Sequence, residues 1–189
     1  MRSVDDAAVT RAAELARDGD RAAAARFVEL TQQQVWRLLV HLSDRGVAQD
    51  LAQETYERAF RSLPGFRGEA PARTWLLSIA RRVAADHLRH TARRPARPAE
   101  LHDADEPVGR TRHGDVAEGV VLRAAVDALD PDRREAFVLT QVVGLGYAEA
   151  AAVCDCPIGT IRSRVARARA DLVDALAADP GGVARETRG

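Results

Sequence analysis

Four arginines lie within eight residues near the C-terminal end of the sequence, with no acidic residue between them. They are Arg162, Arg164, Arg167 and Arg169, in the stretch CPIGTIRSRVARARADL. A solvated helix face normally mixes acids with bases, because opposite charges three or four residues apart stabilise the helix. Arginine side chains bind phosphates and guanine edges through paired hydrogen bonds. The stretch therefore favours contact with DNA over the alternative, a solvated face of an ordinary helical bundle.

The residues around this stretch predict a helix-turn-helix. YAEAAAVC is a short helical segment, a tight turn of about three or four residues follows, and Cys156-Pro157 starts a longer helix that continues to about Leu176. At about 100° per residue, one face of the longer helix collects apolar residues for burial. The opposite side combines small side chains, which allow close approach to DNA, with flanking arginines. The expected buried residues are Ile161, Val165, Ala168 and Leu172, and the expected DNA contacts are Thr160, Arg162, Ser163, Arg164, Ala166 and Arg167.

The first half of the chain predicts a separate domain of four helices. Helical periodicity covers residues 5–17, 20–43, about 47–62 and about 71–91. Helical spacing places Leu51, Thr55, Ala59 and Leu63 on one face of the third helix, and the apolar residues of the fourth are Trp75, Leu76, Ile79, Val83 and Leu88. Asp20 is placed to cap the second of these helices, and the loop LPGFRGEAPAR separates the third from the fourth. Short connections between four helices predict one compact all-α unit.

A charged linker is expected between the two helical units. RRPARPAELHDADEPVGRTRHGD holds three prolines and few apolar residues, so it has little to bury. A second unit begins near Val116, and Asp130 with Pro131 opens one of its helices. The predicted fold class is all-α, with two small helical domains joined by a flexible charged linker. The expected boundaries are 1–91 and 116–177 for the domains, 92–115 for the linker and 178–189 for a tail.

Composition limits the kinds of partner and compartment. Basic and acidic residues balance at 28 each, so an anionic partner must meet a local patch. All basic residues are arginine, which a GC-rich genome explains. No signal peptide is visible and no apolar run approaches the roughly 18 residues of a membrane span, so we expect a cytoplasmic protein without membrane insertion. Cys154 and Cys156 are expected to be reduced thiols, because a disulfide across one residue is strained.

The same residues resemble a known family. The stretch LDPDRREAFVLTQVVGLGYAEAAAVCDCPIGTIRSRVARARADL resembles the promoter −35-binding domain of extracytoplasmic-function (ECF) sigma factors. DLAQETYERAF and TWLLSIARRVAADHLR resemble the family's region-two domain. The resemblance covers two domains in the expected order. It implies an alternative sigma factor that binds core RNA polymerase and directs promoter-specific transcription initiation through the −10 and −35 elements, with no catalytic residue, cofactor or metal.

The resemblance also implies three sites. It assigns the arginine-bearing helix to the −35 element. The family captures an unstacked −10 base with the loop GFRGEAPART and the helix that follows it, which requires a pocket and aromatic or cationic neighbours. The implied −10 residues are Phe66, Arg67, Arg73, Thr74, Trp75, Arg81, Arg82 and Arg89, although helical spacing favours a core role for Trp75. The implied contacts with the polymerase β′ clamp helices are Asp50, Gln53, Glu54 and Glu57.

Several alternatives stay open on the sequence. Arg82 stands where the family commonly has Asn, so the family's −10 base preference does not transfer. A metal enzyme could use His87 and His90, three residues apart and next to Asp86, but the sequence offers no third well-placed ligand. A regulator that binds DNA alone would have a similar helix-turn-helix, but it would not need the acidic DLAQETYERAF face. The sequence leaves undecided whether an anti-sigma factor binds the protein and which promoters the protein serves.

Overall fold

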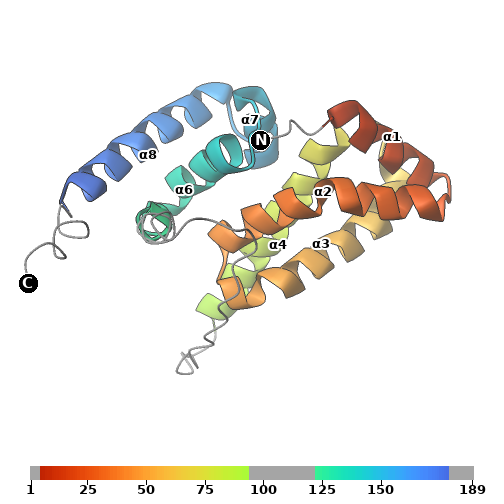
Figure 1. Ribbon diagram of the computed structural model, residues 1–189, viewed down its shortest axis with the longest axis horizontal. Coiled ribbons are helices and arrows are strands. Elements are labelled where there is room, and N and C mark those ends of the chain that lie inside the picture. Colours follow the sequence, from red (N-terminus) through yellow and green to blue (C-terminus); the bar gives the residue numbers. More distant parts are fainter. Residues whose placement is uncertain (1–4, 94–121, 179–189) are drawn as a thin grey trace, which may run out of the picture.

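A computed structural model describes residues 5–93 and 122–178, and within these ranges the chain forms helices and connecting turns without strands (Figure 1). The predicted all-α fold class is confirmed. Most of the predicted linker (92–115), the first residues of the second predicted domain and nearly all of the tail (178–189) lie outside the described residues.

The N-terminal bundle comprises residues 5–93. Its α-helices are α1 (Asp6–Arg17), α2 (Arg21–Leu42), α3 (Ala48–Ser62) and α4 (Ala72–Ala92), with short 3₁₀ turns η1 (Arg45–Val47) and η2 (Leu63–Gly65) at the two ends of α3. The Asp20 carboxylate accepts hydrogen bonds from the amides of Ala22 and Ala23, which confirms the predicted cap of α2. Phe27 and Leu76 are among the fully buried side chains at its centre.

The C-terminal domain comprises residues 122–178. It contains a short helix over 122–127, α6 (Pro131–Phe137), a π-helical turn η3 (Val138–Val142), α7 (Tyr147–Cys154) and α8 (Ile158–Ala178). Asp130 caps α6 by accepting from the amides of Asp132 and Arg133. Gly144 has a positive φ of 83°, which side-chain-bearing residues rarely adopt, and ends the α6–η3 segment as expected.

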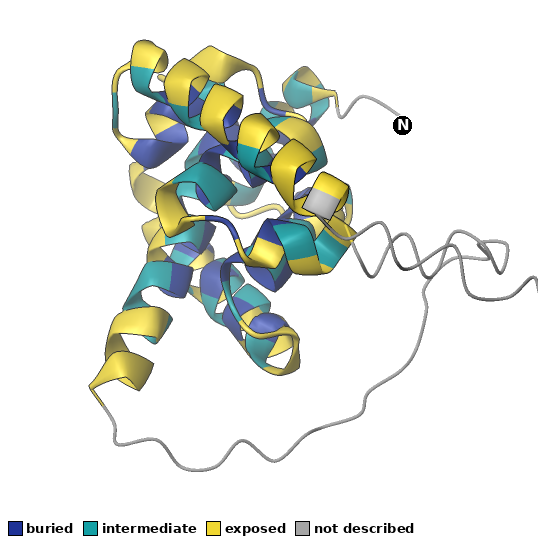
Figure 2. Ribbon diagram, turned by 90° about the vertical axis from the view of Figure 1, so that its left-hand side faces the viewer, coloured by how far each residue is buried: buried dark blue, intermediate teal, exposed yellow. Residues whose placement is uncertain are grey.

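The two domains pack against each other. α7 lies against α4, and α6 and η3 lie against α2, so the C-terminal domain covers one side of the N-terminal bundle (Figure 1). The buried apolar residues form one cluster that includes members of both domains. Figure 2 shows exposed residues along the outer faces of the helices and buried residues on the faces that turn inward. The sequence predicted two helical units but gave no sign that they share an interface.

The apolar pattern of α4 was correct for all but its last member. Leu76, Ile79 and Val83 are buried, whereas Leu88 is 46% exposed. At about 100° per residue, Leu88 lies about 120° to 180° around the helix from these three residues, so it faces solvent rather than the core.

Leu76 and Leu88 offer a matched pair on one helix. We expect Leu76→Ala to lower the free energy of unfolding by about 2–5 kcal/mol, because it empties a fully buried site. Leu88→Ala should change it by less than about 0.5 kcal/mol, as surface substitutions usually do. Urea denaturation followed by circular dichroism measures both, and equal losses would contradict the packing described for α4.

Candidate nucleic-acid interface

The predicted DNA-binding helix is α8, and its two faces are as expected. Ile161, Val165, Ala168 and Leu172 are all buried. The opposite face is open: Arg162, Ser163, Ala166 and Arg167 are exposed, while Thr160 and Arg164 are half-buried at its edges. Small residues between arginines leave room for a duplex to approach the helix backbone.

The arginines of α8 differ in their partners. Arg164 hydrogen-bonds the carboxylate of Asp132 on α6, and Arg169 donates to the side-chain oxygen of Gln141 at 2.9 Å. Arg162 and Arg167 make no ion pair with any residue in the described ranges. These two guanidinium groups are therefore the ones available to a phosphate or a guanine edge.

A tight turn sets α8 beside α7. Three residues separate the helices, and Asp155, the first of them, adopts a left-handed conformation with φ 53° and ψ 52°. The amide of Cys156 then donates to the carbonyl of Ala151 at 3.1 Å, which closes the end of α7. This helix, turn and helix confirm the predicted helix-turn-helix.

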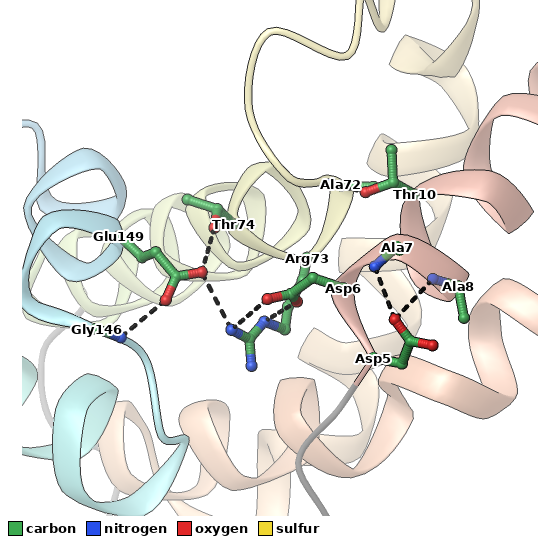
Figure 3. A network of polar contacts seen from close by, with 10 residues as sticks. All are labelled: Asp5, Asp6, Ala7, Ala8, Thr10, Ala72, Arg73, Thr74, Gly146 and Glu149. Carbon is green, nitrogen blue, oxygen red and sulfur yellow. Dashed lines mark hydrogen bonds and ion pairs between the residues drawn. The ribbon is translucent and has the colours of Figure 1, made fainter.

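The start of α7 depends on Glu149. Its Oε2 accepts a hydrogen bond from the amide of Gly146 at 2.8 Å, as in a capping box. A Cβ atom at position 146 would lie 3.3 Å from that oxygen, so glycine allows the close approach. The other carboxylate oxygen of Glu149 points away from its own domain, toward α4 (Figure 3).

The loop before α4 is held in place by the bundle. Phe66 is buried and packs against Trp75 in a tilted arrangement with ring centroids 5.0 Å apart. The Phe66 carbonyl accepts a hydrogen bond from Arg17 at 3.3 Å. Trp75 is half-buried against the core, which agrees with the core role that its spacing favoured. Arg67 is exposed. The amide of Ala72 donates to the Thr10 hydroxyl at 3.1 Å and thereby caps α4.

Arg73 and Thr74 lie at the contact between the two domains. The guanidinium of Arg73 lies between two carboxylates, hydrogen-bonding Asp6 of α1 at 3.0 Å and Glu149 of α7 at 3.1 Å (Figure 3). The Thr74 hydroxyl lies 3.4 Å from the same Glu149 oxygen. Both residues are buried, at 6% and 4% exposure. Two of the predicted −10 residues are thus covered by the C-terminal domain in this arrangement.

The two carboxylates that share Arg73 also influence each other. Burial raises the pKa of the Asp6 carboxyl, Arg73 lowers it, and the negative charge of Glu149 raises it again, with a net rise. One guanidinium therefore balances only part of the negative charge placed around it.

A second contact joins α4 to the C-terminal domain. The Arg81 side chain donates to Glu135 of α6 at 2.6 Å. Burial lowers the pKa of Arg81, but the hydrogen bond and charge of Glu135 more than offset this and raise it overall. Further along α4, Arg82 is exposed, and Arg89 pairs with Asp86 of the same helix. Arg67 is within 4.0 Å of the exposed Glu69, so among the implied −10 arginines only Arg82 makes no ion pair with a residue in the described ranges.

The acidic stripe of α3 faces solvent. Leu51, Thr55 and Ala59 are buried on the other side of the helix, as expected. The stripe itself is open: Asp50, Gln53 and Glu57 are exposed, and the side chain of Glu54 is 44% exposed.

Arg58 links this stripe to α4 through hydrogen bonds. It bonds Glu54 at 2.6 Å and Asp86 at 2.7 Å. The hydrogen bond from Arg58 to Asp86 is the main reason why the pKa of Asp86 lies below its ordinary value. Glu54 is thus held in a fixed position at the surface.

The sequence did not single out Glu135 or Glu149. Each is an ordinary helix-surface acid in the linear pattern, and its arginine partner lies 54 or 76 residues away. The described residues include no cluster of three or more metal-binding side chains and no helix long and apolar enough to cross a membrane.

Comparison with known proteins gives consistent matches to both domains. The sigma-70 region 2 profile matches residues 27–94, and the sigma-70 region 4 profile matches residues 120–172. The chain is 51% identical over 181 residues to the ECF RNA polymerase sigma factor SigC of Mycobacterium tuberculosis, covering 93% of this chain and 92% of that protein.

Solved structures agree with these sequence matches. The structure of CnrH in complex with the cytosolic domain of CnrY superposes with a TM-score of 0.69 at 25% identity, covering 94% of this chain and 99% of that one. The sigma factor RpoE, crystallised with the anti-sigma factor NepR from Bartonella quintana, gives a TM-score of 0.66 at 28% identity, covering 82% and 97%.

The two thiols provide a test of the packing between Cys154 and Glu135 within the C-terminal domain. Burial and the negative charge of Glu135 strongly raise the pKa of the Cys154 thiol, which lies 3.5 Å from that carboxylate, whereas Cys156 is only half-buried. Because the thiolate is the reactive form, we expect the Cys156→Ser variant to react with iodoacetamide at least about tenfold more slowly than Cys154→Ala. Equal rates measured by mass spectrometry would contradict the burial of Cys154.

Proposed function

Because the chain belongs to the ECF sigma factors, non-enzymatic initiation factors that direct RNA polymerase to specific promoters, we propose that its two domains divide promoter recognition between them. The C-terminal domain binds the −35 element through α8. The N-terminal bundle binds the −10 element through the start of α4 and the loop before it. The acidic stripe of α3 binds core polymerase.

The observation that carries this proposal is the open face of α8. Arg162 and Arg167 make no ion pair with described residues, and Ser163 and Ala166 between them are small. A helix with this surface fits the major groove, where guanidinium groups bind guanine edges and phosphates. We assign base contacts to Arg162, Ser163 and Arg167. Arg164 pairs with Asp132 of α6 and thereby positions α8. Because Arg164 lies at the edge of the exposed face of α8, we assign it a contact with the DNA backbone.

The proposed −10 site lies at the start of α4. Capturing an unstacked base costs a few kcal/mol and requires stacking and cationic neighbours. Arg67 and Arg82 are exposed, and Trp75 is half-buried beside the loop. Arg73, Thr74 and Arg81 complete this surface once the C-terminal domain no longer covers them.

Core polymerase is the proposed partner of α3. Asp50, Gln53, Glu54 and Glu57 present a polar, acidic face to solvent. Such a face complements an arginine-rich surface, which the β′ clamp helices supply in the proposed assignment. The protein acts in the cytoplasm, where its polymerase is.

An anti-sigma factor is a further proposed partner. The RpoE neighbour was crystallised with the anti-sigma factor NepR, and this chain shares the fold of RpoE over 82% of its length. A similar regulator would bind the two domains in an arrangement that prevents polymerase binding.

Two substitutions separate the proposed roles. Arg167→Ala should weaken binding to −35 DNA by about 1–3 kcal/mol while leaving polymerase association unchanged, because it removes one base-edge contact. Glu54→Arg should have the opposite effect, since it reverses the charge of the α3 face. Fluorescence anisotropy with promoter DNA and a polymerase pull-down measure the two activities. Arg26→Ala and Glu29→Arg, on the exposed surface of α2, are the matched controls, and loss of both activities in both test variants would contradict the division.

Reconstitution tests the proposed function itself. The purified chain is mixed with actinobacterial core RNA polymerase, and run-off transcription is measured from genomic fragments. We expect stable association and new, specific start sites that depend on the chain. Sequence-specific DNA binding without polymerase association would instead indicate a regulator that acts alone.

A further inference from the structure

One face of α1 follows the loop before α4 from end to end. Asp6, Thr10 and Arg17 are spaced four and seven residues apart, so they lie within about 40° of one another around the helix. Each of them contacts a residue between positions 66 and 73, and α1 lies against both η2 and α4. The contacts run in reverse order, with Arg17 at the beginning of the loop and Asp6 just past its end.

Thr10 holds the end of the loop. Its hydroxyl accepts a hydrogen bond from the Ala72 amide at 3.1 Å (Figure 3). Ala72 is fully buried, and Pro71 before it makes no side-chain cap. This amide is one of those that the start of a helix leaves without a partner in its own helix. Thr10, 62 residues earlier in the chain, therefore supplies the cap that fixes where α4 begins.

Arg17 holds the beginning of the loop. Its guanidinium donates to the Phe66 carbonyl at 3.3 Å, while the Phe66 ring is buried against Trp75. The same arginine also donates to Asp18 at 3.0 Å, a charge-assisted bond that restricts its rotamers. Both the backbone and the side chain of Phe66 are thus fixed by neighbours in the bundle.

Between these two contacts the loop has little else to position it. The side chains of Arg67 and Glu69 are 83% and 80% exposed. A Cβ atom at Gly68 would have, apart from its neighbours in the chain, only a Glu14 oxygen within 4 Å, at 3.8 Å. A hollow of about 370 Å³ separates this part of the loop from α1, lined by Asp6, Ala7, Thr10 and residues 68–71. The contacts at the two ends therefore decide the shape of the loop.

Asp6 adds a contact to the first turn of α4. Its two carboxylate oxygens lie 2.7 and 3.0 Å from two nitrogens of Arg73 (Figure 3). Paired contacts of this kind fix the plane of a guanidinium group. Because Asp6 and Arg73 belong to the same bundle, this contact does not require the C-terminal domain.

We infer that α1 is a clamp for residues 66–71, the −10 loop, in which Thr10 and Arg17 are positioning residues. They hold the loop in the shape that captures an unstacked −10 base, without contacting DNA themselves. The inference rests on the proposed assignment of this loop and the start of α4 to the −10 element. Placement matters because a shift of about 1 Å in a positioned group can lower a rate by about 100-fold. The first helix of the chain thereby becomes a determinant of base discrimination at −10.

Thr10→Val tests the cap of α4. Valine has nearly the same shape as threonine but no hydroxyl, so the Ala72 amide loses its acceptor. Thr10→Ser keeps the hydroxyl, and this conservative variant should behave as the wild type.

Arg17→Gln tests the other end of the loop. The shorter side chain removes the guanidinium that donates to the Phe66 carbonyl. Arg11→Gln is the matched control, because it removes the same charge from α1 at a side chain that is 70% exposed and lies 3.9 Å from Glu14.

Base discrimination by the reconstituted holoenzyme is the first measurement. A promoter identified by run-off transcription is prepared with each of the four bases at each −10 and −35 position, and the ratio between the best and the worst base is measured. We expect Thr10→Val and Arg17→Gln to lower the largest −10 ratio by about tenfold and to leave the −35 ratios unchanged. Thr10→Ser and Arg11→Gln should keep wild-type ratios at both elements. Loss of folded protein alone lowers transcription from all templates equally and leaves every ratio unchanged.

Hydrogen exchange of the free full-length chain is the second measurement. Amides in residues 66–73 should exchange about fivefold faster in Thr10→Val and Arg17→Gln than in the wild type, as expected when a helix cap or an anchoring hydrogen bond is lost. Amides of α3, in the same bundle, should exchange at the wild-type rate, which excludes a general loss of stability.

Unchanged −10 ratios in both test variants would overturn the inference, as would a Thr10→Ser variant that loses as much discrimination as Thr10→Val. Unchanged exchange in residues 66–73 would overturn it too, because α1 would then not hold the loop. If wild-type run-off transcription succeeds while these results are found, only the inference is lost. If no start site depends on the wild-type chain, the proposed function is lost, and hydrogen exchange still decides whether α1 holds the loop.

Discussion

The arrangement of this molecule depends on one guanidinium group. Arg73 lies between Asp6 of α1 and Glu149 of α7, so a single side chain joins the first helix of the chain, the start of α4 and the first helix of the helix-turn-helix. A second pair, Arg81 with Glu135, fixes α6 against the middle of α4. These contacts convert two helical domains into one packed unit with a shared apolar cluster. They also set the availability of the surfaces that the proposed function requires.

The two proposed DNA surfaces therefore differ in how accessible they are. On α8, the exposed arginines Arg162 and Arg167 are ready for a duplex, and the helix is oriented by its buried face and the turn at Asp155. On α4, charged pairs with the C-terminal domain cover Arg73 and Arg81. The acidic stripe on α3 stays open to solvent. In this arrangement the proposed −10 surface is partly covered by the C-terminal domain, whereas the proposed −35 helix and the α3 stripe are open.

Local physics explains what the sequence predicted well. Period-3.6 apolar patterns located the helices, and carboxylates at Asp20 and Asp130 located two of their starts. The same analysis of helical spacing correctly separated the buried from the exposed faces of α3 and α8. It could not place Glu149 against Arg73, because contacts between residues 76 positions apart leave no local signal. Leu88 was grouped with the apolar residues of the buried face of α4, but at about 100° per residue it lies on the opposite side of the helix from Ile79 and is exposed.

The central claim is that the two domains are docked against each other in the free chain through Arg73 and Arg81. Energy transfer between dyes at Gln32→Cys on α2 and Asp174→Cys on α8, in a background of Cys154→Ala and Cys156→Ser, measures this directly. Both labelled positions are exposed. The account predicts efficient transfer in the chain that keeps Glu149 and Glu135, and a clear fall when both are replaced by glutamine. Transfer that is equally efficient with and without these two replacements would contradict it.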